Sequence, residues 1–328
     1  MFSARDYITG HDFKIVHCRV CGLTATRPLP SPVEMEQYYP TAYFGAAGAR
    51  RFPRAIEVLQ NGLYAHRARC VEAALGGRPG RVLDVGCGRG WLLHAFKQFG
   101  WKVQGTEISA SASAHAREVL KLPVAIGRLE DLSLPAGQFD AVMLWHVLEH
   151  LPDPHSLLSE VQRLLKPGGV LFIGVPDFGG WEAQFCRDKW FHLDVPRHLT
   201  HLTRPTLTSA LAVAGFKVKS WSGFAPEYDC FSFVQSMLNR TGLRHNLLYN
   251  LLRGQGAKVL GQKAAAPGQV LTSLALGAVL GVISLPVTLL LGWVGRAGTM
   301  TALAVKDGEP ERGTHALHSH TEGFTSGS

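Results

Sequence analysis

Short apolar segments alternate with segments of helical character between residues 81 and 175. The predicted strands are 81–85, 102–107, 124–126, 140–145 and 170–175, and the predicted helices between them are 91–99, 110–120 and 155–165. Strands separated by helices are typical of parallel β-α-β units, because the helix carries the chain back before the next strand begins. The pattern therefore predicts an α/β fold built on a doubly wound, mostly parallel sheet.

The segments around this region fit one such core. A helix is predicted at 56–75, and a further helix at 206–214 leads into a strand at 217–221. The apolar fraction of 46% is enough for a packed core and excludes wholesale disorder. The six cysteines are too scattered for a disulfide scaffold, which favours reduced thiols in the cytosol. The first residues, MFSARDYITGHDF, contain no apolar run, so we expect no secretory signal.

A glycine-rich loop joins the first predicted strand to its helix, and the segment 82–90 reads VLDVGCGRG. Glycines let a backbone approach a ligand closely, and a helix N-terminus offers unpaired N–H groups. A dinucleotide-binding loop reads G-x-G-x-x-G, but Trp91 occupies the position of the third glycine here. Asp84 would repel a pyrophosphate and suits an ammonium group instead. The loop therefore disfavours a nicotinamide dinucleotide.

This loop resembles the first motif of the class I S-adenosylmethionine-dependent methyltransferases, acid-x-Gly-x-Gly-x-Gly. The resemblance spans 56–225, with a last strand at 299–306, and implies a seven-stranded Rossmann-like methyltransferase sheet. It also implies S-adenosyl-L-methionine as the cofactor, with its methionine part over the loop. The cofactor contacts implied in this loop are Asp84, Gly86, Cys87, Gly88 and Gly90.

Two further segments match the cofactor site of this family. Glu107 ends the second predicted strand, where the resemblance implies that it accepts hydrogen bonds from both ribose hydroxyls. The segment 127–132, GRLEDL, matches the loop that holds the adenine ring. Many relatives have an aspartate where Arg128 stands, so the adenine contact is assigned to Leu129 and Glu130.

The segment 145–154 reads WHVLEHLPDP and follows the fourth predicted strand. Methyltransferases of nucleic-acid bases carry Asp/Asn-Pro-Pro-aromatic there, and its absence argues against a nucleic-acid substrate, as does the concentration of basic charge elsewhere. The segment resembles small-molecule and lipid-linked methyltransferases, including the ubiquinone-pathway O-methyltransferases, which carry Glu-x-x-Glu-His as a proposed metal site. His146, Glu149 and His150 could hold a cation, act as a base or only pack the loop, and we expect no bound metal.

The segment 190–201, WFHLDVPRHLTH, lies where class I enzymes build the lid over the methyl acceptor. A histidine near neutrality can take a proton from a hydroxyl as the methyl group arrives. Within the lid, His198 is the first candidate for this role and His201 the second. We therefore predict His198 and His150 as the catalytic residues, the alternative being that the histidines only tie the lid down.

Cys18 and Cys21 form a Cys-x-x-Cys pair that a proline-rich stretch follows. The arrangement resembles part of the N-terminus of bacterial methyltransferases of sugar and polysaccharide pathways, in which two such pairs bind zinc. A closed zinc site needs four ligands, and only these two are secure. We therefore expect no metal here either.

The last third of the chain is basic and then apolar. From Cys230 to Lys306 there are seven cations and no acidic residue, and 264–295 carries no charge at all. That run is long enough for one membrane span, but the following strand must return to the sheet, and Pro286 divides the run into arms too short to cross. We expect a shallow hairpin or in-plane helices on an anionic membrane surface, the alternative being a buried cap or a dimer interface.

The sequence thus predicts a cytoplasmic S-adenosylmethionine-dependent methyltransferase, peripheral on the cytosolic face of the membrane. Its expected acceptor is small or lipid-linked: a sugar, a polysaccharide precursor or a quinone-like molecule. The alternatives are an NAD-type Rossmann oxidoreductase and a catalytically degenerate membrane-bound scaffold. The expected division is a lead-in at 1–55, the core at 56–226, a hydrophobic helical insertion at 227–297 before the last strand, that strand at 298–306, and a disordered tail at 307–328.

Overall fold

The computed structural model describes residues 2–39, 54–253 and 264–306. The predicted disordered tail at 307–328 and two cations of the basic segment, Lys258 and Lys263, lie outside the described residues. The described chain is built on two sheets, one of seven strands and one of four.

The seven-stranded sheet has the order β10-β11-β8-β7-β4-β5-β6 and confirms the predicted fold. Strands β4 to β8 are parallel, and β11 pairs antiparallel with both β8 and β10. The strands are β4 Arg81–Val85, β5 Lys102–Glu107, β6 Val124–Ile126, β7 Phe139–Trp145, β8 Leu165–Pro176, β10 Phe216–Ser222 and β11 Thr299–Lys306. Because β5 and β7 lie on opposite sides of β4, the strand order reverses at β4, which is where open α/β sheets bind ligands.

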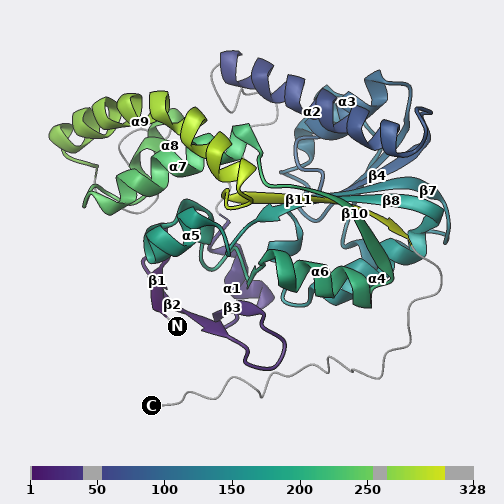
Figure 1. Ribbon diagram of the computed structural model, residues 1–328, viewed down its shortest axis with the longest axis horizontal. Helices are drawn as coiled ribbons and strands as arrows, with labels where there is room; N and C mark the ends of the chain where they lie inside the picture. The colour runs from purple at the N-terminus through teal and green to yellow at the C-terminus, as the bar shows by residue number, and fades with distance from the viewer. Residues whose placement is uncertain (1, 40–53, 254–263, 307–328) are drawn as a thin grey trace.

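Helices cover both faces of this sheet (Figure 1). Helices α2 (Arg54–Ala74) and α3 (Trp91–Gln98) pack on one face, and α4 (Pro154–Leu164) and α6 (Arg204–Val213) on the other. Successive side chains of β4 point to opposite faces of the sheet. Val82 packs with residues of α2 and α3, and Leu83 packs with residues of α4 and α6.

The predicted helix at 110–120 is much shorter, a single π-helical turn at His115–Val119. Serines in front of it satisfy the backbone in another way. Ser109 Oγ accepts from the N–H of Ala112 at 3.2 Å, and Ser113 Oγ donates to the carbonyl of Ser109 at 3.2 Å. Such bonds compete with regular helix formation.

The N-terminal lead-in forms strands that the sequence analysis did not predict. Strands β1 (Phe2–Arg5), β2 (Asp12–His17) and β3 (Thr24–Arg27) are antiparallel, and β3 pairs with β9 (Thr200–His201) of the predicted lid. The lead-in thus packs directly on the lid segment. Short helices and 3₁₀ turns complete this region and the loops: α1 Pro32–Glu36, Leu129–Leu132, Leu148–His150, α5 Trp181–Cys186, Arg187–Lys189 and Phe191–Leu193.

Helices α7 (Pro226–Arg240), α8 (Leu247–Leu252) and α9 (Pro267–Trp293) pack together beside the sheet (Figure 1). The prediction that Pro286 divides the apolar run is wrong, because α9 continues through it. Pro286 lacks the N–H that the carbonyl of Val282 would accept in a regular helix, and the helix continues on both sides of this single missing bond.

Helix α9 is also the one described helix that is long and apolar enough to cross a membrane by length and composition. The mean hydropathy of its most apolar 18-residue window is 2.4, and 17% of that window is buried. Its buried residues are small, namely Ser273, Gly277, Ser284 and Thr288. Its large apolar residues point outward: Leu271, Leu274, Leu276, Val279, Val282, Ile283, Leu285, Leu289, Leu290 and Trp293.

Candidate functional site

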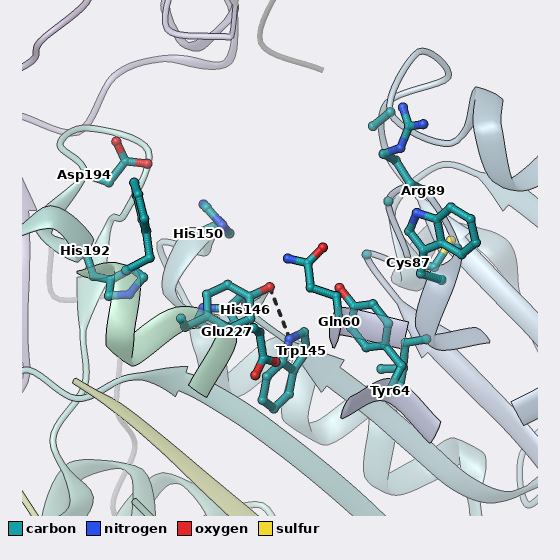
Figure 2. Close-up of a pocket in the computed structure, with 18 of the residues that line it drawn as sticks. Gln60, Tyr64, Cys87, Arg89, Trp145, His146, His150, His192, Asp194 and Glu227 are labelled. Atoms are coloured by element: carbon teal, nitrogen blue, oxygen red, sulfur yellow. Dashed lines mark hydrogen bonds between the residues drawn. The ribbon is translucent and has the colours of Figure 1, made fainter. Parts of the chain in front are cut away.

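A cavity of about 400 Å³ lies at the carboxyl ends of β4, β5 and β7 (Figure 2). It brings together six of the eight predicted cofactor contacts and both predicted catalytic histidines. Its lining includes Asp84, Gly86, Cys87, Gly88, Gly90 and Glu107 at one part and His146, His150, His192 and His198 at another. One cavity thus joins the glycine loop to the predicted acceptor lid.

The glycine loop is held by packing on one side and open on the other. Gly90 has a φ of +81°, and a Cβ added there would lie 2.6 Å from the Cβ of Ala116. Gly88 has a φ of +49°, and a Cβ added there would meet no atom within 4 Å, so this residue faces open space. The N–H of Cys87 donates to the carbonyl of Thr106 at 3.0 Å and ties the loop to β5. The backbone is thereby presented to a ligand.

Two carboxylates, Asp84 and Glu107, line the loop end of the cavity. Glu107 accepts hydrogen bonds from the N–H groups of Gly88, at 3.1 Å, and Ser109, at 3.0 Å, which fixes its orientation. Asp84 is only 2% exposed, and burial together with the charge of Glu107 raises the pKa of Asp84 to about 8. Because the ionised form of Asp84 is disfavoured beside Glu107, this pair of acids suits a ligand that brings a positive charge and hydroxyl donors.

The predicted adenine contacts do not reach this cavity. Leu129 is 3% exposed and belongs to the core of the sheet, while Glu130 forms a long ion pair with Arg128 at 4.0 Å. Neither Leu129 nor Glu130 is among the residues that line the cavity. Their contact with adenine remains a prediction.

His150 and His198 lie together where the lid closes the cavity, with ring centroids 4.8 Å apart. Nδ1 of His150 is 2.9 Å from the carbonyl oxygen of Arg197, and Nδ1 of His198 is 2.7 Å from that of His192. A carbonyl only accepts, so both Nδ1 atoms carry a proton, and the neutral form of either ring keeps a lone pair on Nε2. Burial and the charge of His150 lower the pKa of His198 to about 4, so this ring is neutral at pH 7.

Glu149 lies buried beside these rings and is bonded to His146. Nδ1 of His146 donates to Oε1 of Glu149 at 3.0 Å. Burial would raise the pKa of Glu149, but this bond and the nearby histidines outweigh it and lower the pKa to about 2. His146 itself has a φ of +55°, uncommon for a residue with a side chain, and stacks on Tyr228 with centroids 4.1 Å apart.

The N-terminal lead-in positions the lid histidines, a role that the sequence analysis missed. Thr26 donates its hydroxyl to the carbonyl of His198 at 2.7 Å, and its Oγ1 lies 2.9 Å from Nε2 of His201. His201, the second candidate for the base in the lid, thus bonds to β3 and does not line the cavity. Arg197 is fully buried and pairs with Asp6 of the lead-in. The long-range pairing of β3 with β9 brings Thr26 to His198 and His201.

Aromatic residues make up much of the remaining wall, and none is among the predicted cofactor-binding or catalytic residues. They are Tyr7, Tyr64, Trp91, Trp145, Phe191, Tyr228, Phe231 and Tyr249. Arg67 of α2 stacks 3.8 Å from the ring centroid of Trp145 and forms a buried ion pair with Glu227 of α7, which joins the two helices at this wall. In the sequence these aromatic residues have the same spacing as residues of the hydrophobic core. The pattern therefore does not distinguish aromatic residues that line a cavity from those that are buried in the core.

The chain is similar to known methyltransferases. Residues 60–220 match the family described as a methyltransferase domain. The chain is 32% identical over 143 residues to a probable S-adenosylmethionine-dependent methyltransferase of Mycolicibacterium smegmatis, covering 43% of this chain and 54% of the relative. It is 37% identical over 113 residues to the ubiquinone biosynthesis O-methyltransferase of Xanthomonas axonopodis pv. citri, covering 33% of this chain and 47% of the relative.

The match is confined to part of each protein, since the chain spans about half the length of these curated relatives. A solved structure of an S-adenosylmethionine-dependent methyltransferase from Archaeoglobus fulgidus is 23% identical with a TM-score of 0.47, covering 75% of this chain and 94% of that one. The predicted oxidoreductase alternative finds no support in these matches. Residues 60–220 therefore form a methyltransferase domain, similar to the domains of S-adenosylmethionine-dependent methyltransferases.

Proposed function

We propose that this chain transfers a methyl group from S-adenosylmethionine to a hydroxyl of a small or lipid-linked acceptor at the cytosolic face of a membrane. The acceptor classes are a sugar, a polysaccharide precursor or a quinone-like molecule. The observation that carries the proposal is the single cavity lined by the Asp84 and Glu107 carboxylates and by the neutral histidines of the lid.

The residues of the glycine loop suit this cofactor. S-adenosylmethionine, when bound, supplies an electrophilic methyl group on a sulfonium centre. Asp84 would receive its ammonium group, whose positive charge would favour the ionised form of Asp84 beside Glu107. Glu107, held by two backbone N–H groups, would accept from the ribose hydroxyls. Gly88 leaves the space that a side chain would fill.

His198 and His150 would act on the acceptor. Both Nδ1 atoms are committed to backbone carbonyls, so each ring offers Nε2 as an acceptor. A neutral imidazole in this position would accept the hydroxyl proton, and the oxygen would become a better nucleophile as the proton leaves. The buried carboxylate of Glu149 would stabilise the positive charge that forms on the rings.

The apolar face of α9 supports membrane attachment. Its outward Leu, Ile and Val side chains are 39–79% exposed, whereas its small residues pack inward. Arg240, Arg244 and Arg253 precede it without any acidic residue between them, which suits an anionic lipid surface. The C-terminal end of α9 leads directly into β11, so attachment would leave the sheet in the cytosol.

The same helices connect this surface to the acceptor side of the cavity. Helix α7 packs along α9 and also lines the cavity through Tyr228 and Phe231. An acceptor with a lipid tail could therefore extend from the cavity toward the membrane along α7. This proximity supports a lipid-linked acceptor over a freely soluble one.

Methyl transfer from S-adenosylmethionine labelled in the methyl group tests the proposal. The full chain is incubated separately with bacterial membrane lipids and with soluble sugar nucleotides and phenols. Label that enters the lipid fraction supports a lipid-linked acceptor, and label in the soluble fraction supports a small one. If S-adenosylhomocysteine does not bind and no fraction is labelled, the degenerate scaffold is the better account.

A further inference from the structure

A second cavity, of about 300 Å³, lies at the C-terminal end of α9 and shares no lining residue with the first. Helix α9 runs toward the sheet and ends beside the start of β11 (Figure 1). The walls of this cavity come from Asp177 after β8, from Arg204 at the start of α6, from 221–223 at the end of β10 and from 292–295 at the end of α9. The proposed methyl transfer makes no use of it.

The cationic side of this cavity is Arg204. Its guanidinium carbon lies 4.9 Å from the ring centroid of Trp221, which also lines the cavity and orients the arginine. Arg204 is the first residue of α6, so the positive end of that helix lies at the same wall. The exposed Arg296 follows directly after the wall residue Gly295. Neither arginine forms an ion pair with a described residue, so both can pair with an anion.

The same cavity contains an acid, Asp177, which is only 7% exposed. Its Oδ1 accepts from the N–H of Gly179 at 2.8 Å, which fixes the carboxyl group. Burial raises the pKa of Asp177 to about 6, although the N–H of Gly179 and the charges of Arg296 and Arg204 act in the opposite direction. The carboxylate is therefore largely ionised at pH 7. The last carbonyls of α9 lack partners within the helix and add partial negative charge. Charges of both signs at one cavity suit a zwitterionic ligand.

Exposed apolar residues continue along α9 up to this cavity. Leu289 and Leu290 are 48% and 59% exposed, and Trp293, which lines the cavity, is 86% exposed. Tryptophan is enriched at the membrane–water interface, where its ring lies at the level of the headgroups. With α9 on the membrane, as in the proposed function, the cavity lies at the same level.

We propose that this cavity binds the headgroup of a phospholipid that carries both a phosphate and a primary ammonium group, as phosphatidylethanolamine does. Arg204 and Arg296 would hold the phosphate, and Asp177 would accept N–H bonds from the ammonium group. Gly295 leaves room, because a Cβ added there would meet only Nη1 of Arg204, at 4.0 Å. The site deepens the proposed membrane attachment and rests on it, but it is independent of methyl transfer. It fixes the end of α9 that leads into β11.

Sedimentation of the full chain with two matched sets of vesicles tests the site. Both sets contain the same share of phosphatidylglycerol, and the remainder is phosphatidylcholine in one set and a mixture with phosphatidylethanolamine in the other. The methylated ammonium of choline has no N–H to donate to Asp177, so wild type should bind the ethanolamine set about 10-fold more tightly. Asp177→Asn should lose this preference. Arg204→Gln should bind both sets about 10-fold more weakly, because both lipids carry the phosphate.

Three controls accompany these variants. Arg117→Gln removes the same charge from an exposed arginine that lines neither cavity, and it should sediment as wild type does. Equal S-adenosylhomocysteine affinity in all variants, measured by calorimetry, shows that they are folded. Glycerophosphoethanolamine, which is the same headgroup without acyl chains, should bind far more weakly than the vesicles. If it binds wild type as tightly as they do, the cavity takes a soluble phosphate ester and the assignment to a lipid is overturned.

The outcomes separate this site from the proposed function. A wild type that sediments equally with both sets overturns the headgroup site and leaves membrane attachment and methyl transfer standing. Equal weakening in Arg204→Gln and Arg117→Gln overturns it as well, because the loss then reflects net charge alone. A wild type that sediments with neither set overturns the proposed membrane attachment and the headgroup site with it, whereas S-adenosylhomocysteine binding would still support the methyl donor.

Discussion

Arg197 of the lid and Asp6 of the N-terminal lead-in form an ion pair, with Nη2 and Oδ1 2.8 Å apart and both side chains fully buried. Arg197 also pairs with Asp194, which lines the cavity. The pair connects a turn after β1 to the residue next to His198. The lead-in is therefore part of the support of the candidate site.

Replacing Asp6 by asparagine should destabilise the protein and disturb the lid. Removing one partner of a buried pair typically costs about 3–5 kcal/mol, because a charge stays buried with less compensation. We expect the lower part of this range, since Asp194 remains. Urea unfolding measures the loss. Asp12→Asn is the matched control, because its ion pair with Arg5 is exposed and should be worth less than about 1 kcal/mol. Equal losses in the two variants would contradict this account.

The central strands could be predicted because their signal is local. The observed bounds of β4, Arg81–Val85, and β5, Lys102–Glu107, match the predicted ones, since a short buried apolar run between helices has few other interpretations. The glycine loop and its two acids follow from position along these strands. Their convergence at one cavity needs only the rule that parallel strands end at the same edge.

Other features depend on contacts between distant segments and left no local signal. Strand β3 pairs with the two-residue strand β9, and this pairing brings Thr26 to His198. The proximity of His198 to Glu149 depends on how the lid folds back. A periodic pattern reports which face of an element is buried but not what lies against it.

The carboxylate of Glu107 should be needed for cofactor affinity. Glu107→Ala removes charge-assisted hydrogen bonds worth about 1.5–3 kcal/mol, or roughly 10- to 150-fold in affinity. Calorimetric titration with S-adenosylhomocysteine measures this loss. Glu118→Ala, an exposed acid outside the cavity, should leave affinity unchanged. Wild-type affinity in a folded Glu107→Ala variant would show that the ribose contact is assigned to the wrong residue.

Asp84 should make the stability of the cofactor-free protein depend on pH. Burial and the charge of Glu107 raise the pKa of Asp84 from 3.8 to about 8 in the folded state. Between these values the folded protein holds a proton that the unfolded chain releases, so stability falls as pH rises, by up to about 1.4 kcal/mol per pH unit. Asp84→Asn removes this dependence and should gain more stability over wild type at pH 8 than at pH 5.

Thermal unfolding of wild type and Asp84→Asn at the two pH values measures this gain. The same variant should bind S-adenosylhomocysteine more weakly, because the ammonium group loses its acid. Identical pH dependence in the two proteins would mean that Asp84 does not carry the raised pKa.

His198 and His150 should affect the rate of methyl transfer and not the binding of the cofactor. His198→Gln or His150→Gln should lower kcat about 10²- to 10⁴-fold, the usual range for a lost proton acceptor. His201→Gln is the control within the lid, since His201 bonds to Thr26 and lies outside the cavity. Full activity in both site variants would indicate that the transfer needs only the proximity of acceptor and cofactor, without a histidine that accepts the proton.

The outward face of α9 should hold the protein on anionic membranes. Attraction of Arg240, Arg244 and Arg253 to the lipid should weaken with salt, whereas insertion of the apolar face should not, so sedimentation with anionic vesicles should persist in part at high salt. Leu271→Glu/Val282→Glu places charge on residues that are 71% and 79% exposed and should abolish the salt-resistant fraction. Val213→Glu makes the same kind of change on α6 of the core, at an exposed site, and should leave sedimentation unchanged. S-adenosylhomocysteine affinity should be equal in all three proteins, because these positions lie outside the cavity. If the charged α9 variant still sediments in high salt, the apolar face has another partner, and the attachment of this chain to lipid would have to be abandoned.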